Sequence, residues 1–199
     1  MQQLIIFRRL KFVVFFAALL PLVFMIWLAA TNHLGPDPGK KLALFTGGWA
    51  IRFLLLTLLI SSVSRVSPEL RMLLQWRRMM GLFTFFYSSV HLFVFVVLIL
   101  GFDTTLLLSE INKRPYILAG MLAWVLMLPL AVTSNQWMIR QLGGKKWKQL
   151  HCLIYIALLL ALAHVIWQVR SSWFDAVFYT GGSILLLAER VRLSKMPKK

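Results

Sequence analysis

The chain is short of acidic residues and cysteine, and these shortages exclude several classes of protein. Its 199 residues include 6 Asp and Glu and one cysteine, Cys152. A single cysteine excludes an intrachain disulfide, and with it a disulfide-stapled secreted scaffold. Charged residues make up 14% of the chain, whereas about a quarter is usual in soluble globular domains. The sequence therefore fits neither an ordinary soluble enzyme nor a disordered chain.

Apolar residues make up 60% of the chain, and the mean hydropathy is +0.78. A membrane-spanning helix needs about 20 predominantly apolar residues. Six apolar runs approach or reach that length: Leu10–Ala30, Leu42–Val63, Met79–Leu100, Tyr116–Asn135, Leu150–Val169 and Trp173–Ala188. All have helix length, so the pattern predicts an all-α integral membrane protein, a bundle of six transmembrane helices. The expected connections are short: Thr31–Lys41, Ser64–Arg78, Gly101–Pro115, Gln136–Gln149 and Arg170–Ser172. Residues 1–199 are therefore expected to form one transmembrane domain without a soluble part.

The charge of the chain is strongly one-sided, with 22 Lys and Arg and a formal net charge of +16. Sixteen of the 22 cations fall on one side of the predicted bundle, in the loops and tails that include Arg77 and Arg78. An excess of Lys and Arg marks the cytoplasmic side of a membrane protein. We therefore expect both termini in the cytoplasm, and we interpret the charge as an orientation signal rather than a nucleic-acid-binding surface.

Two histidines lie inside predicted spans, where ionisable residues are costly and usually functional. His91 lies about 18 Å and His164 about 21 Å from the cytoplasmic starts of their spans, at 1.5 Å per residue. The two spans run in the same direction, so the imidazoles are expected at one level in the outer half. Such a pair can supply both axial ligands of a haem iron. The alternative is that each histidine only bridges helices by hydrogen bonds.

Two further ionisable residues lie within or at the edge of the spans. His151 is at the cytoplasmic mouth, 13 residues before His164, and an ideal helix places the two side chains about 140° apart. It is interpreted as a ligand of a second haem, a neighbour of another cofactor, or an interfacial histidine. Arg52 lies in the outer half of the second span, where a haem propionate would satisfy its guanidinium. Snorkelling of Arg52 to the interface remains the alternative.

Residues 45–65, 76–95 and 113–167 resemble a known family. The segment WKQLH, followed after twelve residues by a second histidine, is the most specific part. These segments resemble the MsrQ family, the haem-binding membrane subunits of bacterial periplasmic methionine sulfoxide reductase systems. That family belongs to the ferric-reductase-like transmembrane group, so the resemblance implies a ferric-reductase-like core over residues 42–190.

The resemblance implies the function of an electron-transfer subunit rather than of the catalytic reductase itself. It implies a cytochrome b of the bacterial inner membrane with haem b and FMN as cofactors. The implied donor is the quinone pool or a cytosolic flavin reductase. The implied acceptor is a periplasmic molybdopterin-containing catalytic subunit, MsrP-like, that supports repair of oxidised periplasmic proteins.

The haem ligands carry over onto His91, His164 and, less completely, His151. Related NADPH oxidases have a fourth histidine where this chain has Arg77 or Arg78. These arginines, with the basic segment Lys145–Lys148, are the expected site of the FMN phosphate.

Three other functions remain open from the sequence. One is a quinol-oxidising cytochrome b subunit of another respiratory complex, such as a hydrogenase or formate dehydrogenase. Another is a haem-free transporter that uses the histidines as a proton relay. The third is a membrane anchor that recruits a soluble partner without redox work.

Overall fold

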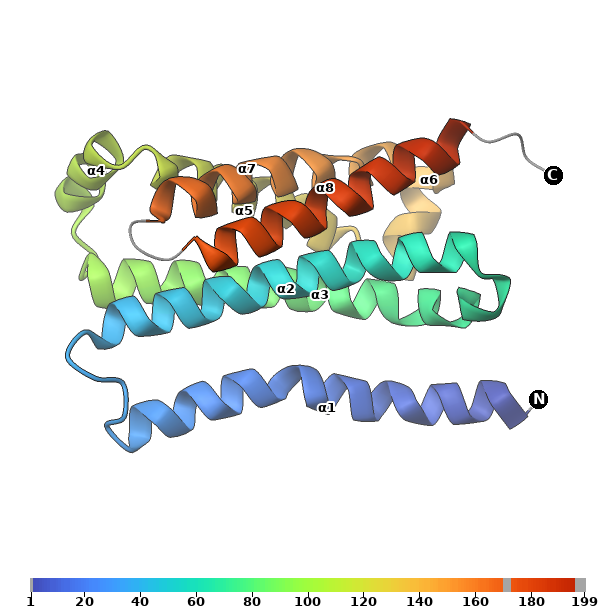
Figure 1. Cartoon of the computed structure of the whole chain (residues 1–199), viewed down its shortest axis with the longest axis horizontal. Coiled ribbons are helices and arrows are strands. Elements are labelled where there is room, and N and C mark those ends of the chain that lie inside the picture. The colour runs from blue at the N-terminus through green and yellow to red at the C-terminus, as the bar shows by residue number, and fades with distance from the viewer. Residues whose placement is uncertain (1, 170–172, 196–199) are drawn as a thin grey trace.

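The computed structural model describes residues 2–169 and 173–195, and this part of the chain is helical and contains no strand (Figure 1). The elements are α1 (Gln2–Ala30), α2 (Pro38–Val66), the 3-10 helix η1 (Pro68–Leu73), α3 (Leu74–Val94), the π-helix η2 (Phe95–Ile99), α4 (Thr104–Lys113), α5 (Tyr116–Val132), α6 (Gln136–His151), α7 (Leu153–Gln168) and α8 (Phe174–Lys195). The all-α prediction is confirmed for the described residues.

The long helices lie roughly parallel to one another (Figure 1). α2 and α3 form a closely packed antiparallel hairpin, and α5 and α7 form a second closely packed pair. α8 packs on α2 and α7, while α3 also touches α5, so the two pairs join into one bundle. The start of α1 and the end of α8 lie at one end of the bundle, and α4 lies at the other (Figure 1).

Four stretches are long and apolar enough to cross a membrane: Leu10–Ala30, Pro38–Val66, Glu69–Ile99 and Gln136–Gln168. A fifth is obtained if α4 and α5, bent by 112° at their junction, count as one broken span. A membrane protein with several apolar helices is thus confirmed. The sixth span predicted over Trp173–Ala188 falls in the helix α8, and the total of six spans stays a prediction.

Two segments expected to be plain connections contain helices. Residues 101–115 include α4, which begins where the Asp103 carboxylate accepts hydrogen bonds from the backbone N–H groups of Thr105 and Leu106. Residues 136–149 belong to α6, which the Asn135 side chain caps and which Gly143 interrupts with a φ of 73°. Glycine adopts such a left-handed conformation without a steric penalty. Polar composition predicted loops here, whereas capping residues allow short helices.

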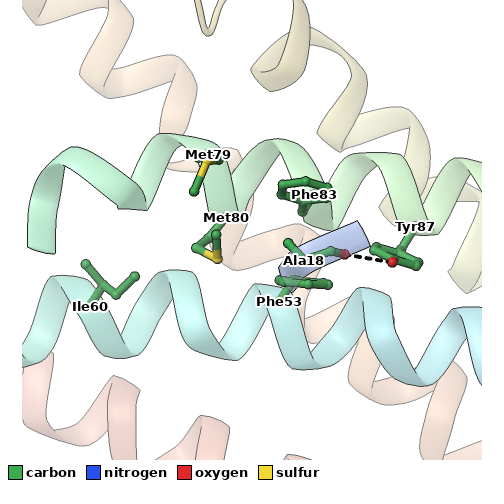
Figure 2. Close-up of a cluster of buried hydrophobic side chains, with 7 residues drawn as sticks. All are labelled: Ala18, Phe53, Ile60, Met79, Met80, Phe83 and Tyr87. Atoms are coloured by element: carbon green, nitrogen blue, oxygen red, sulfur yellow. Dashed lines mark hydrogen bonds between the residues drawn. The ribbon is translucent and has the colours of Figure 1, made fainter. Parts of the chain in front are cut away.

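α1 makes few contacts with the rest of the bundle, and Tyr87 of α3 provides a specific one. The Tyr87 side chain is fully buried, and its hydroxyl donates to the Ala18 carbonyl at 2.8 Å (Figure 2). It also accepts from the Leu22 N–H at 3.2 Å. The hydroxyl therefore inserts into the main-chain hydrogen-bonding pattern of α1 beside Pro21, a residue that already lacks an N–H.

The core around this contact joins α1, α2 and α3 in a single cluster (Figure 2). Its buried members are Ala18, Phe53, Ile60, Met79, Met80, Phe83 and Tyr87. Phe53 stacks on Tyr87 with ring centroids 5.3 Å apart. Such packing fixes the rotation of α3, and with it the direction in which His91, one turn beyond Tyr87, projects.

Candidate metal centre

The structure brings the two predicted intramembrane histidines together. His91 lies near the C-terminal end of α3 and His164 near the C-terminal end of α7. Their ring centroids are 6.0 Å apart, and the ring planes meet at 84°. Both side chains are half-buried in the bundle. The equal depths expected from the sequence therefore correspond to direct proximity across the bundle.

Each imidazole is oriented by a backbone carbonyl on the neighbouring helix. His91 Nδ1 lies 2.9 Å from the Ala43 carbonyl of α2, and His164 Nδ1 lies 2.7 Å from the Tyr116 carbonyl of α5. A carbonyl only accepts, so each Nδ1 carries the proton and donates. In the neutral ring the lone pair is then on Nε2, the tautomer that binds a metal ion.

The surroundings of His91 and of His164 repeat one arrangement. In each, 48 residues separate the histidine from the residue whose carbonyl it contacts. One helical turn after that residue is a glycine, Gly47 in α2 and Gly120 in α5. Both glycines lie against the imidazole: a Cβ added at Gly47 would be 3.1 Å from His91 Nδ1, and one at Gly120 would be 2.7 Å from His164 Nδ1.

Sequence reasoning missed these glycines, because a glycine inside an apolar run carries no signal of its own. The signal that was available is their spacing, since Gly47 precedes His91 by as many residues as Gly120 precedes His164. Only the structure shows that each glycine, because it has no side chain, makes room for an imidazole ring.

The donor set fits a bis-histidine haem. Imidazole nitrogens bind first-row metal ions at about 2 Å, so two rings on opposite sides of one ion have centroids about 6 Å apart. The observed separation is 6.0 Å. Among the described residues no group of three or more His, Cys, Asp or Glu side chains forms a metal site. Two such imidazoles would hold a haem iron between α3 and α7, and the iron would supply one-electron transfer there.

Arg52 lies on α2, five residues after Gly47. Its guanidinium carbon is 5.2 Å from the centroid of the Trp49 ring and 5.9 Å from that of Tyr179 in α8. The Arg52 residue is exposed on the surface of the bundle, and within the described residues the only ion pair joins Arg114 to Glu110. Arg52 therefore holds its charge between two aromatic faces without an acidic partner.

His151 lies apart from the pair, at the inner end of the bundle. It ends α6, Cys152 separates it from α7, and α7 then rises about 16 Å from Leu153 to His164. The His151 ring stacks on Trp147 with centroids 3.8 Å apart, and its Nδ1 contacts the Trp147 carbonyl at 3.0 Å. Its Nε2 is buried without a hydrogen-bond partner.

The two predicted inner arginines differ. Arg77 is half-buried, and its charge acts on His151 and on the guanidinium of Arg190 in α8. Arg190 lies over the Tyr155 ring, 4.8 Å from its centroid. Arg78 is exposed, and no contact recorded for it joins it to His151. The structure therefore groups Arg77 with His151 and leaves Arg78 at the surface.

Residues 46–162 match the family described as Ferric reductase like transmembrane component. The chain belongs to this family. It is also 40% identical over 187 residues to a protein of Xanthomonas euvesicatoria pv. vesicatoria (strain 85-10), covering 91% of this chain and 85% of that protein. That relative is named Protein-methionine-sulfoxide reductase heme-binding subunit MsrQ. The resemblance to MsrQ proteins is thereby confirmed, and the family match includes both glycines and His91.

Proposed function

We propose that this protein is a membrane cytochrome b that serves a periplasmic methionine sulfoxide reductase. The observation that carries the proposal is the His91–His164 pair, with both rings fixed for metal binding and 6.0 Å between their centroids. The name of the Xanthomonas relative, a heme-binding subunit of such a system, supports the same function.

The residues of the centre have distinct tasks in this proposal. His91 and His164 hold the haem b iron through Nε2, while the carbonyls of Ala43 and Tyr116 keep the proton on Nδ1. A bound haem supplies reversible one-electron transfer at the iron. Gly47 and Gly120 leave space for the rings, and Arg52 pairs with a haem propionate, because a guanidinium in the membrane needs an anion.

The topology proposed with this function is six spans in the bacterial inner membrane, with both termini in the cytoplasm. The start of α1 and the end of α8 lie at the same end of the bundle, which is consistent with this topology (Figure 1). The histidine pair then lies in the outer half of the membrane, which shortens electron transfer to a periplasmic acceptor. We propose that this acceptor is a molybdopterin-containing catalytic subunit that repairs oxidised proteins.

The inner group of His151 and Arg77 is proposed as the entry side for electrons. The buried Nε2 of His151 lacks a hydrogen-bond partner, and Arg77 brings a positive charge close to it. These features suit a second haem or an FMN, with Arg78 supplying a further cation for a phosphate at the surface. The donor would be the quinone pool or a cytosolic flavin reductase.

A pyridine haemochrome assay on purified protein, combined with oxidised and reduced spectra, tests the proposal. Wild-type protein is expected to contain haem b with a low-spin spectrum. His91→Ala and His164→Ala should each abolish that low-spin signal. Colourless wild-type protein, or full haem content with unchanged spectra in both variants, would disprove the proposal and would favour a haem-free role such as a proton relay.

A further inference from the structure

Where α2 packs against α8, the side chains of Arg52 and Tyr179 approach one point. A Cβ added at Gly48 would be 3.7 Å from Arg52 Nη1 and 3.8 Å from the Tyr179 hydroxyl. Gly48 follows Gly47, the residue that lies against the His91 ring. The polar ends of Arg52 and Tyr179 therefore come together at Gly48, the residue next to Gly47 of the proposed haem site.

The Tyr179 hydroxyl is buried within reach of the Arg52 guanidinium, and among the described residues it meets no acceptor for its own proton. The residue is only 3% exposed, and it packs in an apolar cluster with Ile51, Leu54 and Leu158. A hydroxyl proton without an acceptor in such surroundings costs free energy. A buried hydroxyl aimed at a guanidinium without an ionic partner indicates that a further group belongs between them.

The chemistry of the two side chains defines that group. A guanidinium only donates, and a phenol hydroxyl donates readily, so the group is an acceptor. It is also an anion, because a neutral acceptor would leave the Arg52 charge uncompensated at membrane depth. Asp175, one turn before Tyr179 on α8, is the acid whose charge acts on Tyr179, but it is exposed and forms no ion pair with Arg52 among the described residues.

We propose that Tyr179 donates a hydrogen bond to a carboxylate held by Arg52, and that this carboxylate is a propionate of the haem. The inference rests on the proposed haem function and adds to it a residue of α8, which sequence reasoning did not select. Tyr179 acts here as a binding residue, because its hydroxyl touches the cofactor directly. α8 thereby contributes to the site in addition to packing against it.

Haem and haem dimethyl ester, which lacks the carboxylates, distinguish this role from simple packing. Haem-depleted wild-type and Tyr179→Phe proteins are titrated with each compound, and affinity is measured from the Soret band. We expect Tyr179→Phe to weaken haem binding at least about tenfold, because a hydrogen bond to a charged group is lost. Binding of the dimethyl ester should be equal in the two proteins.

Ser183→Ala is the matched control on α8. The Ser183 hydroxyl is fully buried and donates to the Tyr179 carbonyl at 2.7 Å within its own helix, so its removal should leave both affinities unchanged. If Tyr179→Phe fails to fold, Arg52→Gln provides the second variant, with the same expected loss for haem and none for the ester.

Three results would overturn the inference. Equal weakening of haem and ester binding would assign Tyr179 to packing alone. Unchanged haem affinity would place the propionate elsewhere. Unchanged haem affinity with less co-purifying fatty acid in Tyr179→Phe would assign the carboxylate to a lipid. Failure of the proposed function is separate, because wild-type protein would then bind neither compound.

Discussion

The outer and inner histidines differ in what orients their rings. His91 and His164 each contact a carbonyl on a different helix and lie against a glycine of that helix. The Nδ1 of His151 contacts the carbonyl of Trp147, one turn earlier in its own helix α6, and the Leu130 backbone of α5 also acts on the ring. The rings of His91 and His164 are therefore held by other helices, whereas the His151 ring is held in part by its own helix.

This difference indicates that the His91–His164 site is preorganised to bind a cofactor, whereas the site at His151 is not. Ligands fixed by packing and by outer hydrogen bonds bind a cofactor without further ordering of the protein. His91 and His164 each meet that condition, because each ring has a carbonyl partner and a glycine packed against it. The inner site has one histidine, an unpartnered Nε2 and nearby arginine charges, so it depends on what binds there to complete it.

Gly120→Ala is the largest expected disruption of the outer site that keeps both ligands. The added methyl would lie 2.7 Å from His164 Nδ1 and 3.0 Å from Cε1, so the ring or α5 must shift. Overpacking of this kind costs about 1–3 kcal/mol, which corresponds to haem binding about 5- to 150-fold weaker. Haem titration measures the change, and wild-type affinity would contradict the assigned role of Gly120.

Gly47→Ala should have the same kind of effect with a smaller size. The methyl would be 3.1 Å from His91 Nδ1, a contact that a shift of a few tenths of an ångström relieves. We expect a loss of about 1 kcal/mol or less in haem binding. Gly181→Ala is a suitable control, since a Cβ there meets nothing within 4 Å. A larger loss for Gly47→Ala than for Gly120→Ala would be inconsistent with the geometry.

His151→Ala tests the separation of the two sites. Because His151 shares no contact with His91 or His164 among the described residues, the outer low-spin signal should keep its position and intensity. Any loss should be confined to a cofactor at the inner end, seen as reduced haem or flavin content. Electron paramagnetic resonance separates the signals, and a changed outer signal would show that the sites are coupled.

Asp103→Ala is expected to have the smallest effect, because Asp103 caps α4, away from the histidine pair. Hydrogen bonds, first from the Thr105 hydroxyl and then from the N–H groups of Leu106 and Thr105, lower the pKa of Asp103 below its usual 3.8. Capping of α4 is therefore present at neutral pH and is lost as the pH falls through the lowered pKa. Hydrogen exchange at α4 should increase in the variant, while haem content stays unchanged.

Much of the helical architecture could be predicted from the sequence. The apolar runs lie within helices because a bilayer-length run has to satisfy its own backbone hydrogen bonds. The depths of His91 and His164 followed from counting residues along parallel helices. The 140° expected between His151 and His164 assumed one ideal helix, whereas the chain ends α6 at His151 and begins α7 at Leu153.

Other features could not be found in the same way. α4 and α6 were expected as loops, because their polar composition hid the capping side chains of Asp103 and Asn135. Tyr87 looked like one aromatic residue among many, and its insertion into α1 depends on how α1 packs against α3. Tyr179 had no distinguishing neighbour in the sequence, since Arg52 lies on another helix.

The sequence by itself determined that this protein lies in a membrane, is helical, and carries two histidines at one depth. These properties depend on composition and on the constant rise of a helix, which act locally along the chain. Only the tertiary structure decided that the two rings lie 6.0 Å apart, that Gly47 and Gly120 make room for them, and that α8 brings Tyr179 to Arg52. Such relations depend on the rotation and spacing of helices, which packing between distant segments sets.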